Sequence, residues 1–583
     1  MSHFGSDADT QTPGVTALWQ DALTGVSEAM MAAARAPLKV EATRPFDPFA
    51  LFRTMSEFAL GLGQRPQQLL EVQLEAAREW GEFWASAWVP RTPEQRPRDR
   101  RFAATEWEEN AYYRTLRDAY LLASKQLRDL VAQGSGDTPN RAMMNFLADQ
   151  YLNAVAPTNF AMTNPQVMQR IVETGGANLV AGFAHLIEDL SVGKGIVRRR
   201  TQDSFEKGRT IAATPGAVVF QNDLFQLIQY DPATPDVAQE PLLYVPPLVN
   251  KFYMIDLQPK SSLVKWLVDQ GRTVFVVSWI NPDERHRDCG VGDYVLKGIV
   301  EALGAARKAS GADKVDLFSF CLGGTLVAVA LAWLQAKGRA GEVNTATLIG
   351  SMVDFADMRD WAAFVHEGHL DALEKHLEQR GFIDSTELQQ LFAAVRSNDL
   401  IWSSVINHYL LDKAAPPSDL LYWFEDGARI PQAFLKSYNR GLLFANALKS
   451  GSGFTVGEVA IDLARVTTPV FLIALKDDHV SAWEAVYDGG KLFGGPITYV
   501  LGGSGHNAGV INPPAANKHG FWTSDARPAT AAEWLAGAEK HPGSWWPHWD
   551  AWLNAHGSGE RVEARKPANP IEPAPGSYVS ITH

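Results

Sequence analysis

The chain has 583 residues, of which 46% are apolar and 20% charged, values typical of a globular protein with more than one domain. Its net charge of −13 argues against a general nucleic-acid binder, because affinity for phosphate backbones accumulates from lysine and arginine. Two cysteines cannot build the disulfide framework of a secreted fold, the first residues lack a basic and apolar leader, and no apolar run has the length of a membrane span. We therefore expect a cytoplasmic protein.

Residues 1–200 are predicted to form an all-helical N-terminal domain. Six apolar residues repeat there at three- and four-residue steps and form a stripe along one helix: Leu70, Leu74, Ala77, Trp80, Trp84 and Trp88. The stripe packs either on neighbouring helices or the rest of the chain, or on a partner outside the chain. Two arginine clusters, within 96–101 and 198–200, are either solvated faces or sites for the phosphates of a substrate.

Residues 201–583 are predicted to form an α/β domain. Short β-branched and aromatic runs alternate there with helical segments, which is typical of a mostly parallel sheet with crossover helices. The eight predicted strands are 217–220, 224–230, 242–245, 273–279, 315–320, 345–349, 469–475 and 497–501. The first two flank a turn-like QND sequence and are predicted to form a hairpin.

A long insertion separates the sixth and seventh predicted strands. More than 100 residues lie between them, whereas a simple crossover needs about a dozen. The insertion includes helix-like stretches at 370–380 and 385–397. We predict that residues 354–465 form a helical cap over the carboxyl edge of the sheet. The proline-rich tail after Arg565 is predicted to be extended.

Cys321 stands where a strand, a tight turn and a helix follow one another in VDLFSFCLGGTLVAVALAWL. This arrangement is that of a nucleophile elbow, with Ser319 in place of the usual first glycine. Gly323 and Gly324 let the helix approach the strand closely, and the elbow places the sulfur beside the N-terminus of the helix, where a thiolate is favoured. Cys321 is therefore the candidate nucleophile.

An acid follows the seventh predicted strand and a histidine follows the eighth, in the chain order nucleophile, acid, base of the α/β-hydrolase fold. These residues are Asp478 in KDDH and His506 in SGH. Asp477 competes with Asp478 as the acid, and we favour Asp478; His479 is a candidate supporting group. The sequence thus predicts an α/β-hydrolase fold with a Cys-His-Asp triad.

These residue types suit acyl transfer from a thioester. A free thiol is mostly protonated at neutral pH, so we expect His506 to remove the proton of Cys321 before the thiolate attacks. The reaction also needs donors for the oxyanion. The backbone N–H of Leu322 is one candidate, and the loop 246–250 supplies the second, for which Val249 is the candidate among several amides that stay open.

A metal site is a weaker hypothesis. His366, His369 and His376 lie in HEGHLDALEKH, which lacks the H-E-x-x-H order of a zinc protease, so we expect an exposed helical face there and no metal. The sequence has no Walker motif and no G-x-G-x-x-G after a strand.

The chain resembles the polyhydroxyalkanoate synthases, and among them the single-subunit class I type, over roughly residues 99–583. The motifs that carry the resemblance are DRRFAATEWEENAYY, APTNFAMTNP, GRTIAATPGAVVFQNDLFQLIQY, PPLVNKFYMIDLQP, SWINPD, SFCLGG, NDLIW, LLYWFEDG, KDDHVSAW, SGHNAGVINPP and APGSYV. By this resemblance Cys321 matches the nucleophile, Asp478 the aspartate and His506 the histidine, while Trp423 matches a tryptophan linked to dimer formation.

The resemblance implies polymerisation of (R)-3-hydroxyacyl-CoA, with short monomers such as 3-hydroxybutyryl-CoA favoured and CoA released. It implies a homodimer at the surface of polymer granules, with granule-associated proteins as further partners and no metal or redox cofactor. Two alternatives stay open. One is a thioesterase or polymer depolymerase of the same fold, and the other is a granule-coat protein without catalysis.

Overall fold

The computed structural model describes residues 66–86, 97–133, 138–191, 204–413, 417–450 and 453–582. The chain forms two compact units. The first consists of the described residues up to 200 together with Gln390–Pro416, and the second consists of Thr201–Gln389 and Pro417–His583. The segment 354–465, predicted as one cap, is thus divided, since its middle part belongs to the helical unit.

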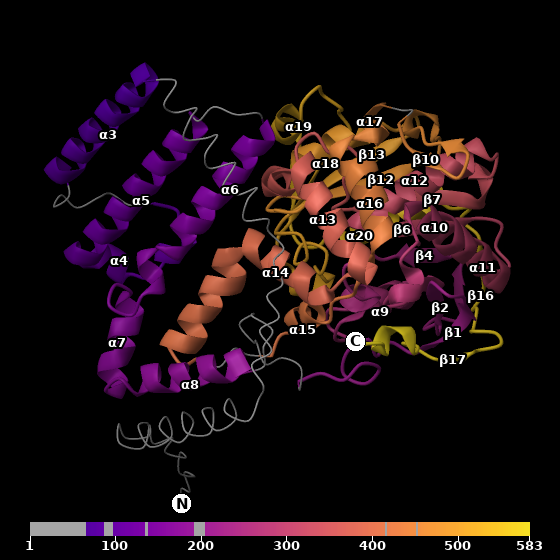
Figure 1. Cartoon of the computed structure of the whole chain (residues 1–583). Coiled ribbons are helices and arrows are strands. Elements are labelled where there is room, and N and C mark those ends of the chain that lie inside the picture. The colour runs from indigo at the N-terminus through magenta and orange to yellow at the C-terminus, as the bar shows by residue number, and fades with distance from the viewer. Residues whose placement is uncertain are drawn as a thin grey trace, which may run out of the picture. The chain divides into compact units, whose positions relative to one another are not determined.

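The first unit is helical where the structure describes it (Figure 1). Its longer helices are α3 Pro66–Ser86, α5 Ala111–Ala132, α6 Thr138–Ala154, α7 Pro165–Thr174 and α8 Ala177–Ser191. Side-chain caps define their starts: Asn110 Oδ1 accepts from the N–H of Tyr112 at 2.9 Å before α5, and Asn164 caps α7, where Pro165 follows. The prediction of a helical region before the sheet domain is confirmed.

The apolar stripe on α3 is covered along one edge. Trp80 donates from Nε1 to the side chain of Gln126 on α5 at 2.9 Å. Leu70, Leu74 and Trp84 are 56%, 63% and 58% exposed. The stripe therefore contacts a neighbouring helix. That its exposed residues bind a partner outside the chain stays a prediction.

The first arginine cluster lies partly within the described residues. Arg101 forms an ion pair with Asp99 at 2.7 Å and donates to the hydroxyl of Tyr120 at 2.8 Å. Its side chain therefore binds groups of the helical unit itself. Trp88, Arg96 and the cluster 198–200 lie outside the described residues.

The second unit is built on an eleven-stranded sheet with the order β15-β14-β13-β12-β7-β6-β4-β5-β2-β1-β17. The strands are β1 Gly216–Gln221, β2 Phe225–Tyr230, β4 Leu242–Val245, β5 Val274–Trp279, β6 Val315–Phe320, β7 Val343–Ile349, β12 Val470–Leu475, β13 Ile497–Gly502, β14 Phe521–Thr523, β15 Glu539–His541 and β17 Glu572–Pro573. The hairpin β1–β2 and the pair β2–β5 are antiparallel, and the strands from β5 to β13 are parallel. All eight predicted strands are confirmed, with ends that agree within two residues.

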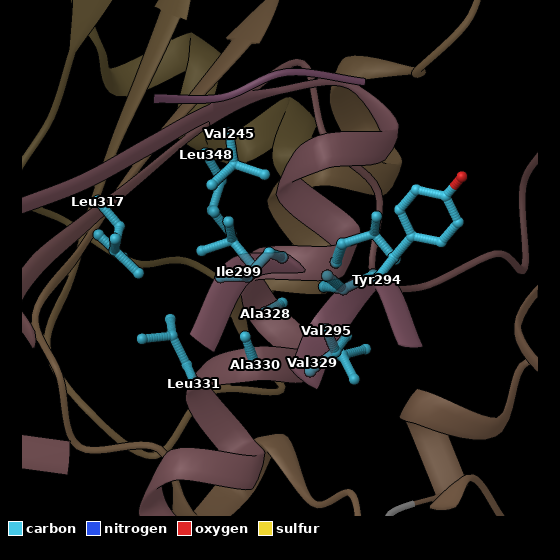
Figure 2. Close-up of a cluster of buried hydrophobic side chains, with 14 of the residues drawn as sticks. Val245, Tyr294, Val295, Ile299, Leu317, Ala328, Val329, Ala330, Leu331 and Leu348 are labelled. Atoms are coloured by element: carbon cyan, nitrogen blue, oxygen red, sulfur yellow. The ribbon is translucent and has the colours of Figure 1, made fainter. Parts of the chain in front are cut away.

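The centre of the sheet is buried on both faces. Every residue of β5, β6 and β12 is buried, and such strands have the continuous apolar runs seen in the sequence. Helix α12 Leu322–Ala336, which follows Cys321, packs on one face. Figure 2 shows this packing between α12, the π-helical segment η6 Tyr294–Val300 and strands β4, β6 and β7, through side chains that include Ala328, Val329, Leu331, Tyr294, Val295, Ile299, Val245, Leu317 and Leu348.

The insertion after β7 is mainly helical. It includes α13 Glu367–Arg380, α14 Ser385–Val395, α15 Asp419–Glu425, α16 Gln432–Ser437 and the π-helical segment η11 Tyr438–Phe444. The helix-like stretches expected at 370–380 and 385–397 correspond to α13 and α14. Segments η9 Asn398–Trp402 and η10 Val405–Leu410 belong to the first unit, where Asn178 of α8 donates to the carbonyl of Leu410 at 2.6 Å.

The C-terminal tail is part of the second unit and packs within it. Strand β17 pairs with β1, and the short helix η14 Tyr578–Ser580 follows it. In Figure 1 the yellow C-terminal segment passes β1 at the label β17. Among the helices that the structure describes, none combines the length and the apolar composition of a membrane-crossing segment.

Candidate active site

Cys321 occupies the sharp turn between β6 and α12. Its φ of 53° and ψ of −130° lie in a region that costs a residue other than glycine about 1–3 kcal/mol. Its N–H donates to the carbonyl of Ile349 at 2.8 Å, which ties the turn to the end of β7. Cys321 is partly exposed at the start of α12, as expected for a nucleophile elbow.

The two glycines after Cys321 are required by space. A Cβ on Gly323 would lie 2.5 Å from the carbonyl oxygen of Val245, and a Cβ on Gly324 would lie 2.5 Å from the Cβ of Ser351. Ser319 is fully buried, and its hydroxyl would lie 3.2 Å from that second Cβ. The serine that replaces the usual first glycine therefore fits because the residue at 324 has no side chain.

The loops after β12 and β13 bring Asp478 and His506 together. Asp478 Oδ2 lies 2.6 Å from Nδ1 of His506, and its Oδ1 accepts the N–H groups of Val480 and Ser481 at 2.7 and 2.9 Å. The carboxyl group is fully buried, and the imidazole is almost so. Asp477 is exposed. Of the two competing acids, Asp478 is the one that holds the histidine.

The sulfur of Cys321 lies close enough to the same imidazole to affect its pKa. Because Asp478 takes Nδ1, the nitrogen that remains for the sulfur is Nε2. Burial acts to lower the pKa of His506, but the carboxylate of Asp478 and the sulfur of Cys321 outweigh it and raise the pKa to about 10. The imidazole is therefore placed to hold a proton between the carboxylate of Asp478 and the sulfur of Cys321.

The two candidate oxyanion donors lie on neighbouring parts of the sheet edge. Leu322 is the first residue of α12, where the N–H has no partner within the helix. Val249 lies in the loop after β4, and β4 pairs in parallel with β6 through Val245 and Ser319, so this loop leaves the sheet next to the elbow. The carbonyl of Val249 accepts from the N–H of Ala428 at 2.9 Å, which fixes its peptide against the insertion.

Tyr438 at the start of η11 is a site residue that the sequence analysis missed. Its ring stacks on Phe434, with centroids 5.7 Å apart. Burial, and after it the nearby sulfur of Cys321, raise the pKa of Tyr438, while a hydrogen bond to Thr325 acts in the opposite direction. The phenol therefore lies near the sulfur of the candidate nucleophile. No sequence signal marks it, because it comes from the insertion, more than 100 residues after Cys321.

The loop that carries His506 is held by tryptophans at the start of α20 Trp546–His556. Trp545 and Trp546 are fully buried and donate from Nε1 to the carbonyls of Gly509 and Val510 at 2.9 and 3.0 Å. The sequence analysis missed this support as well. The run SWWPHW was its available signal, since buried tryptophans need a partner for the indole N–H.

The other candidate groups lie apart from the triad or in a supporting position. His376 Nε2 lies 2.9 Å from Glu387 Oε1, and His369 is partly buried. Across the described ranges, no group of three or more His, Cys, Asp or Glu is arranged to hold a metal ion. His479 has its ring 6.4 Å from that of His506, and Cys289 is partly buried against the main core.

Comparison with known proteins identifies the family. Residues 98–267 match the family model of the poly-beta-hydroxybutyrate polymerase (PhaC) N-terminus, and residues 241–513 match that of the alpha/beta hydrolase fold. The chain is 40% identical over 544 residues to a poly(3-hydroxyalkanoate) polymerase of Methylorubrum extorquens, covering 91% of this chain and 89% of the relative. The chain belongs to the poly(3-hydroxyalkanoate) polymerase family. The family and the fold expected from the sequence are both confirmed.

Other relatives agree. The chain is 39% identical to the poly(3-hydroxyalkanoate) polymerase subunit PhaC of Cupriavidus necator, with 89% of both chains covered. Among solved structures, a hydrolase from Pseudomonas aeruginosa covers 52% of this chain and 95% of its own length, with 14% identity and a TM-score of 0.31. The members of the family are acyltransferases, so the expectation of an acyltransferase is confirmed.

Proposed function

We propose that this enzyme polymerises (R)-3-hydroxyacyl groups from their CoA thioesters and that Cys321 carries the acyl group as a thioester. The observation that supports this most directly is the placement of Cys321 near His506, whose Nδ1 lies 2.6 Å from Oδ2 of Asp478, at the carboxyl edge of the sheet. The polymerase names of the relatives support the reaction class. The alpha/beta hydrolase model that matches residues 241–513 includes all three residues.

In the proposed first step His506 holds the proton of the Cys321 thiol, and the thiolate attacks the thioester carbonyl. The N–H groups of Leu322 and Val249 are the proposed donors to the oxyanion that forms. Collapse of this intermediate breaks the bond to the sulfur of CoA, which leaves with the proton from His506 as the free thiol. The 3-hydroxyl of one acyl unit then attacks the thioester carbonyl of another, and His506 accepts the hydroxyl proton. The new ester bond lengthens the polymer as the carbon–sulfur bond breaks, and the sulfur that leaves, of Cys321 or of CoA, takes up that proton from His506.

Asp478 is proposed to matter more for elongation than for acylation. A thiol has a pKa within a few units of neutrality, so His506 can deprotonate Cys321 with little help. A hydroxyl group is a far weaker acid, and its attack requires an imidazole whose protonated form is stabilised by a carboxylate. The contact of 2.6 Å between Asp478 and His506 supplies that stabilisation.

The insertion is proposed to gate the site. Two of its segments in the second unit lie at the catalytic edge: Ala428 donates to the carbonyl of Val249, and Tyr438 lies near enough to the sulfur of Cys321 for its pKa to be affected. Closure of these segments would exclude water from the acyl thioester. Equal hydrogen exchange of this part of the insertion in free and acylated enzyme would count against gating.

The rest of the proposal concerns the setting of the reaction. We infer short monomers such as 3-hydroxybutyryl-CoA, a homodimer, and a cytoplasmic location at granule surfaces with granule-associated proteins as partners. The exposed stripe of Leu70, Leu74 and Trp84 supports an external partner for the helical unit. Light scattering with and without substrate tests the dimer, and binding to isolated granules tests the location.

The decisive experiment supplies the purified enzyme with 3-hydroxybutyryl-CoA and longer analogues, and follows CoA release and insoluble polymer together. Cys321→Ala is expected to abolish both, whereas Cys289→Ala, the matched control in the other cysteine, is expected to be active. Free hydroxy acid in place of polymer would identify a thioesterase or depolymerase. Equal loss in both folded variants would overturn the assignment of Cys321, and no CoA release by the parent would indicate a coat protein.

A further inference from the structure

The loop that carries Val249 is held in place by hydrogen bonds on two sides, one of which involves the C-terminal end of the chain. The segment Phe424–Ala428 of the insertion provides the first: Asn250 Nδ2 donates to the carbonyl of Phe424 at 3.2 Å, and Ala428 donates to that of Val249 at 2.9 Å. The bond from Ala428 fixes the peptide between Val249 and Asn250, and the bond to Phe424 holds the side chain of Asn250. The loop therefore depends on contacts from distant parts of the sequence.

Lys251 provides the second attachment. Its side chain is 5% exposed, and Nζ donates to the carbonyl of Ile581 at 2.9 Å. Its own carbonyl accepts Nε1 of Trp423 at 2.7 Å, and Trp423 is 3% exposed. The residue next to Asn250 is thus bonded to the C-terminal tail through its side chain and to α15 through its backbone.

The tail is bonded to its surroundings at further points, including Val579 and Ile581. Lys207 Nζ donates to the carbonyl of Val579 at 3.2 Å and to Asp426 at 2.7 Å. Asn281 Nδ2 donates to the carbonyl of Ile581 at 3.3 Å. Val579 is fully buried. The end of the chain is therefore packed into the structure beside the loop rather than lying over its surface.

A buried ammonium group is costly unless its hydrogen bonds are satisfied. Asp426 attracts Lys251 electrostatically, but its carboxylate already accepts from Lys207 and from the hydroxyl of Tyr253 at 2.7 Å each. Burial lowers the pKa of Lys251 to about 8 despite this attraction. The carbonyl of Ile581 is consequently an important partner for the Lys251 side chain.

We propose that Lys251 is a positioning residue for the oxyanion loop and that the C-terminal segment Tyr578–Ile581 holds it in place. The inference rests on the proposed function, in which the N–H of Val249 donates to the oxyanion that forms when Cys321 is acylated. Loss of the Lys251–Ile581 contact lets the loop shift relative to the elbow. It leaves the bond between His506 and Asp478 untouched, since these residues lie on the loops after β13 and β12.

The test uses two variants of the full enzyme, Lys251→Met and a chain ending at Gly576. Removal of one oxyanion donor lowers a rate by about 100- to 1,000-fold, so a misaligned donor is expected to slow the CoA burst by about 10- to 100-fold with KM within about threefold of the parent. Alkylation of Cys321 by iodoacetamide, which needs the thiolate but no oxyanion donor, is expected to stay within about twofold. Lys265→Met, at an exposed lysine paired with Asp269, is the control and is expected to match the parent.

The two changes are also combined. Because both changes break the contact between Lys251 and Ile581, the double variant is expected to be no slower than the slower single variant. Multiplying defects, an unchanged burst rate in either variant, or a parallel loss of burst and alkylation would each overturn the proposal. Failure of the proposed function is distinguishable, because the parent enzyme would then show no acyl group on Cys321.

Discussion

The glycines of the elbow offer a matched pair of substitutions whose effects differ in a way that the structure specifies. A Cβ on Gly324 would lie 2.5 Å from the Cβ of Ser351 and closer still to its hydroxyl oxygen. A Cβ on Gly323 would lie 2.5 Å from the carbonyl oxygen of Val245, which is backbone. A second substitution at Ser351 can therefore clear the space around Gly324 but cannot clear the space around Gly323.

We expect Gly324→Ala to lower the free energy of unfolding of the second unit by about 1–3 kcal/mol, because its neighbours must move by at least about 0.5 Å in a packed core. Adding Ser351→Gly removes both obstructing atoms and is expected to recover most of this loss. About 0.5–1 kcal/mol stays lost through the backbone freedom of glycine, together with the hydrogen bond from Ser351 to the carbonyl of Ile349. Ser351→Ala keeps the obstructing Cβ and is expected to recover less.

Thermal unfolding and the rate of Cys321 alkylation would be measured for each single and double variant. Gly323→Ala is expected to be destabilised equally with and without Ser351→Gly, and to alter alkylation because it displaces the start of α12. A stable Gly324→Ala variant would refute the packing argument. So would rescue of Gly323→Ala by Ser351→Gly, because no atom of Ser351 is among those that its Cβ would meet.

Three further predictions concern single groups. Burial raises the pKa of Asp316 from 3.8 to about 6, so its contribution to stability is fully present below pH 3.8 and is lost as the pH rises to about 6. Asp316→Asn is thus expected to stabilise the enzyme by up to about 3 kcal/mol at pH 7.5, by urea unfolding, with the gain shrinking toward pH 4; a constant difference would contradict this. Burial lowers the pKa of His369 to about 4, with a smaller contribution from the nearby His366. The free energy of unfolding is therefore expected to fall as the pH drops from 6.5 to 4. His369→Gln should make this pH dependence weaker in the same assay. Asp478→Asn is expected to release a burst of CoA close to the enzyme concentration but to elongate the polymer at least about tenfold more slowly than the parent. The control Asp477→Asn, at an exposed side chain, should elongate normally. If Asp478→Asn loses the burst as completely as His506→Gln, Asp478 does not act mainly in elongation.

The strands and the elbow could be predicted because their signals are local. Strands β5, β6 and β12 are buried on both faces, so each appears in the sequence as a continuous apolar run. The turn at Cys321 needs small residues at 323 and 324 for reasons of space, and two consecutive glycines are visible without a structure. The order of nucleophile, acid and base follows from the order of the strands.

The short edge strands had no comparable signal. Strands β14 and β15 have three residues each, and in β15 Glu539 and Lys540 are exposed, so neither an apolar run nor an alternation marks them. They form because β13 offers an unpaired edge and the chain after His506 returns to it. Such pairing depends on which edge is available, and this is a property of the assembled sheet.

By itself the sequence determined the parts of this enzyme whose physics is contained in a few neighbouring residues: the buried strands, the strained turn at Cys321 and the candidate acid and base that follow two strands. Only the tertiary structure decided which groups surround them. The choice of Asp478 over Asp477, the position of Tyr438 near the sulfur and the bond from Lys251 to Ile581 each join segments that lie apart in the chain. Polar contacts of this kind leave no periodic pattern, because a side chain finds its partner only after the strands and helices that carry both have packed.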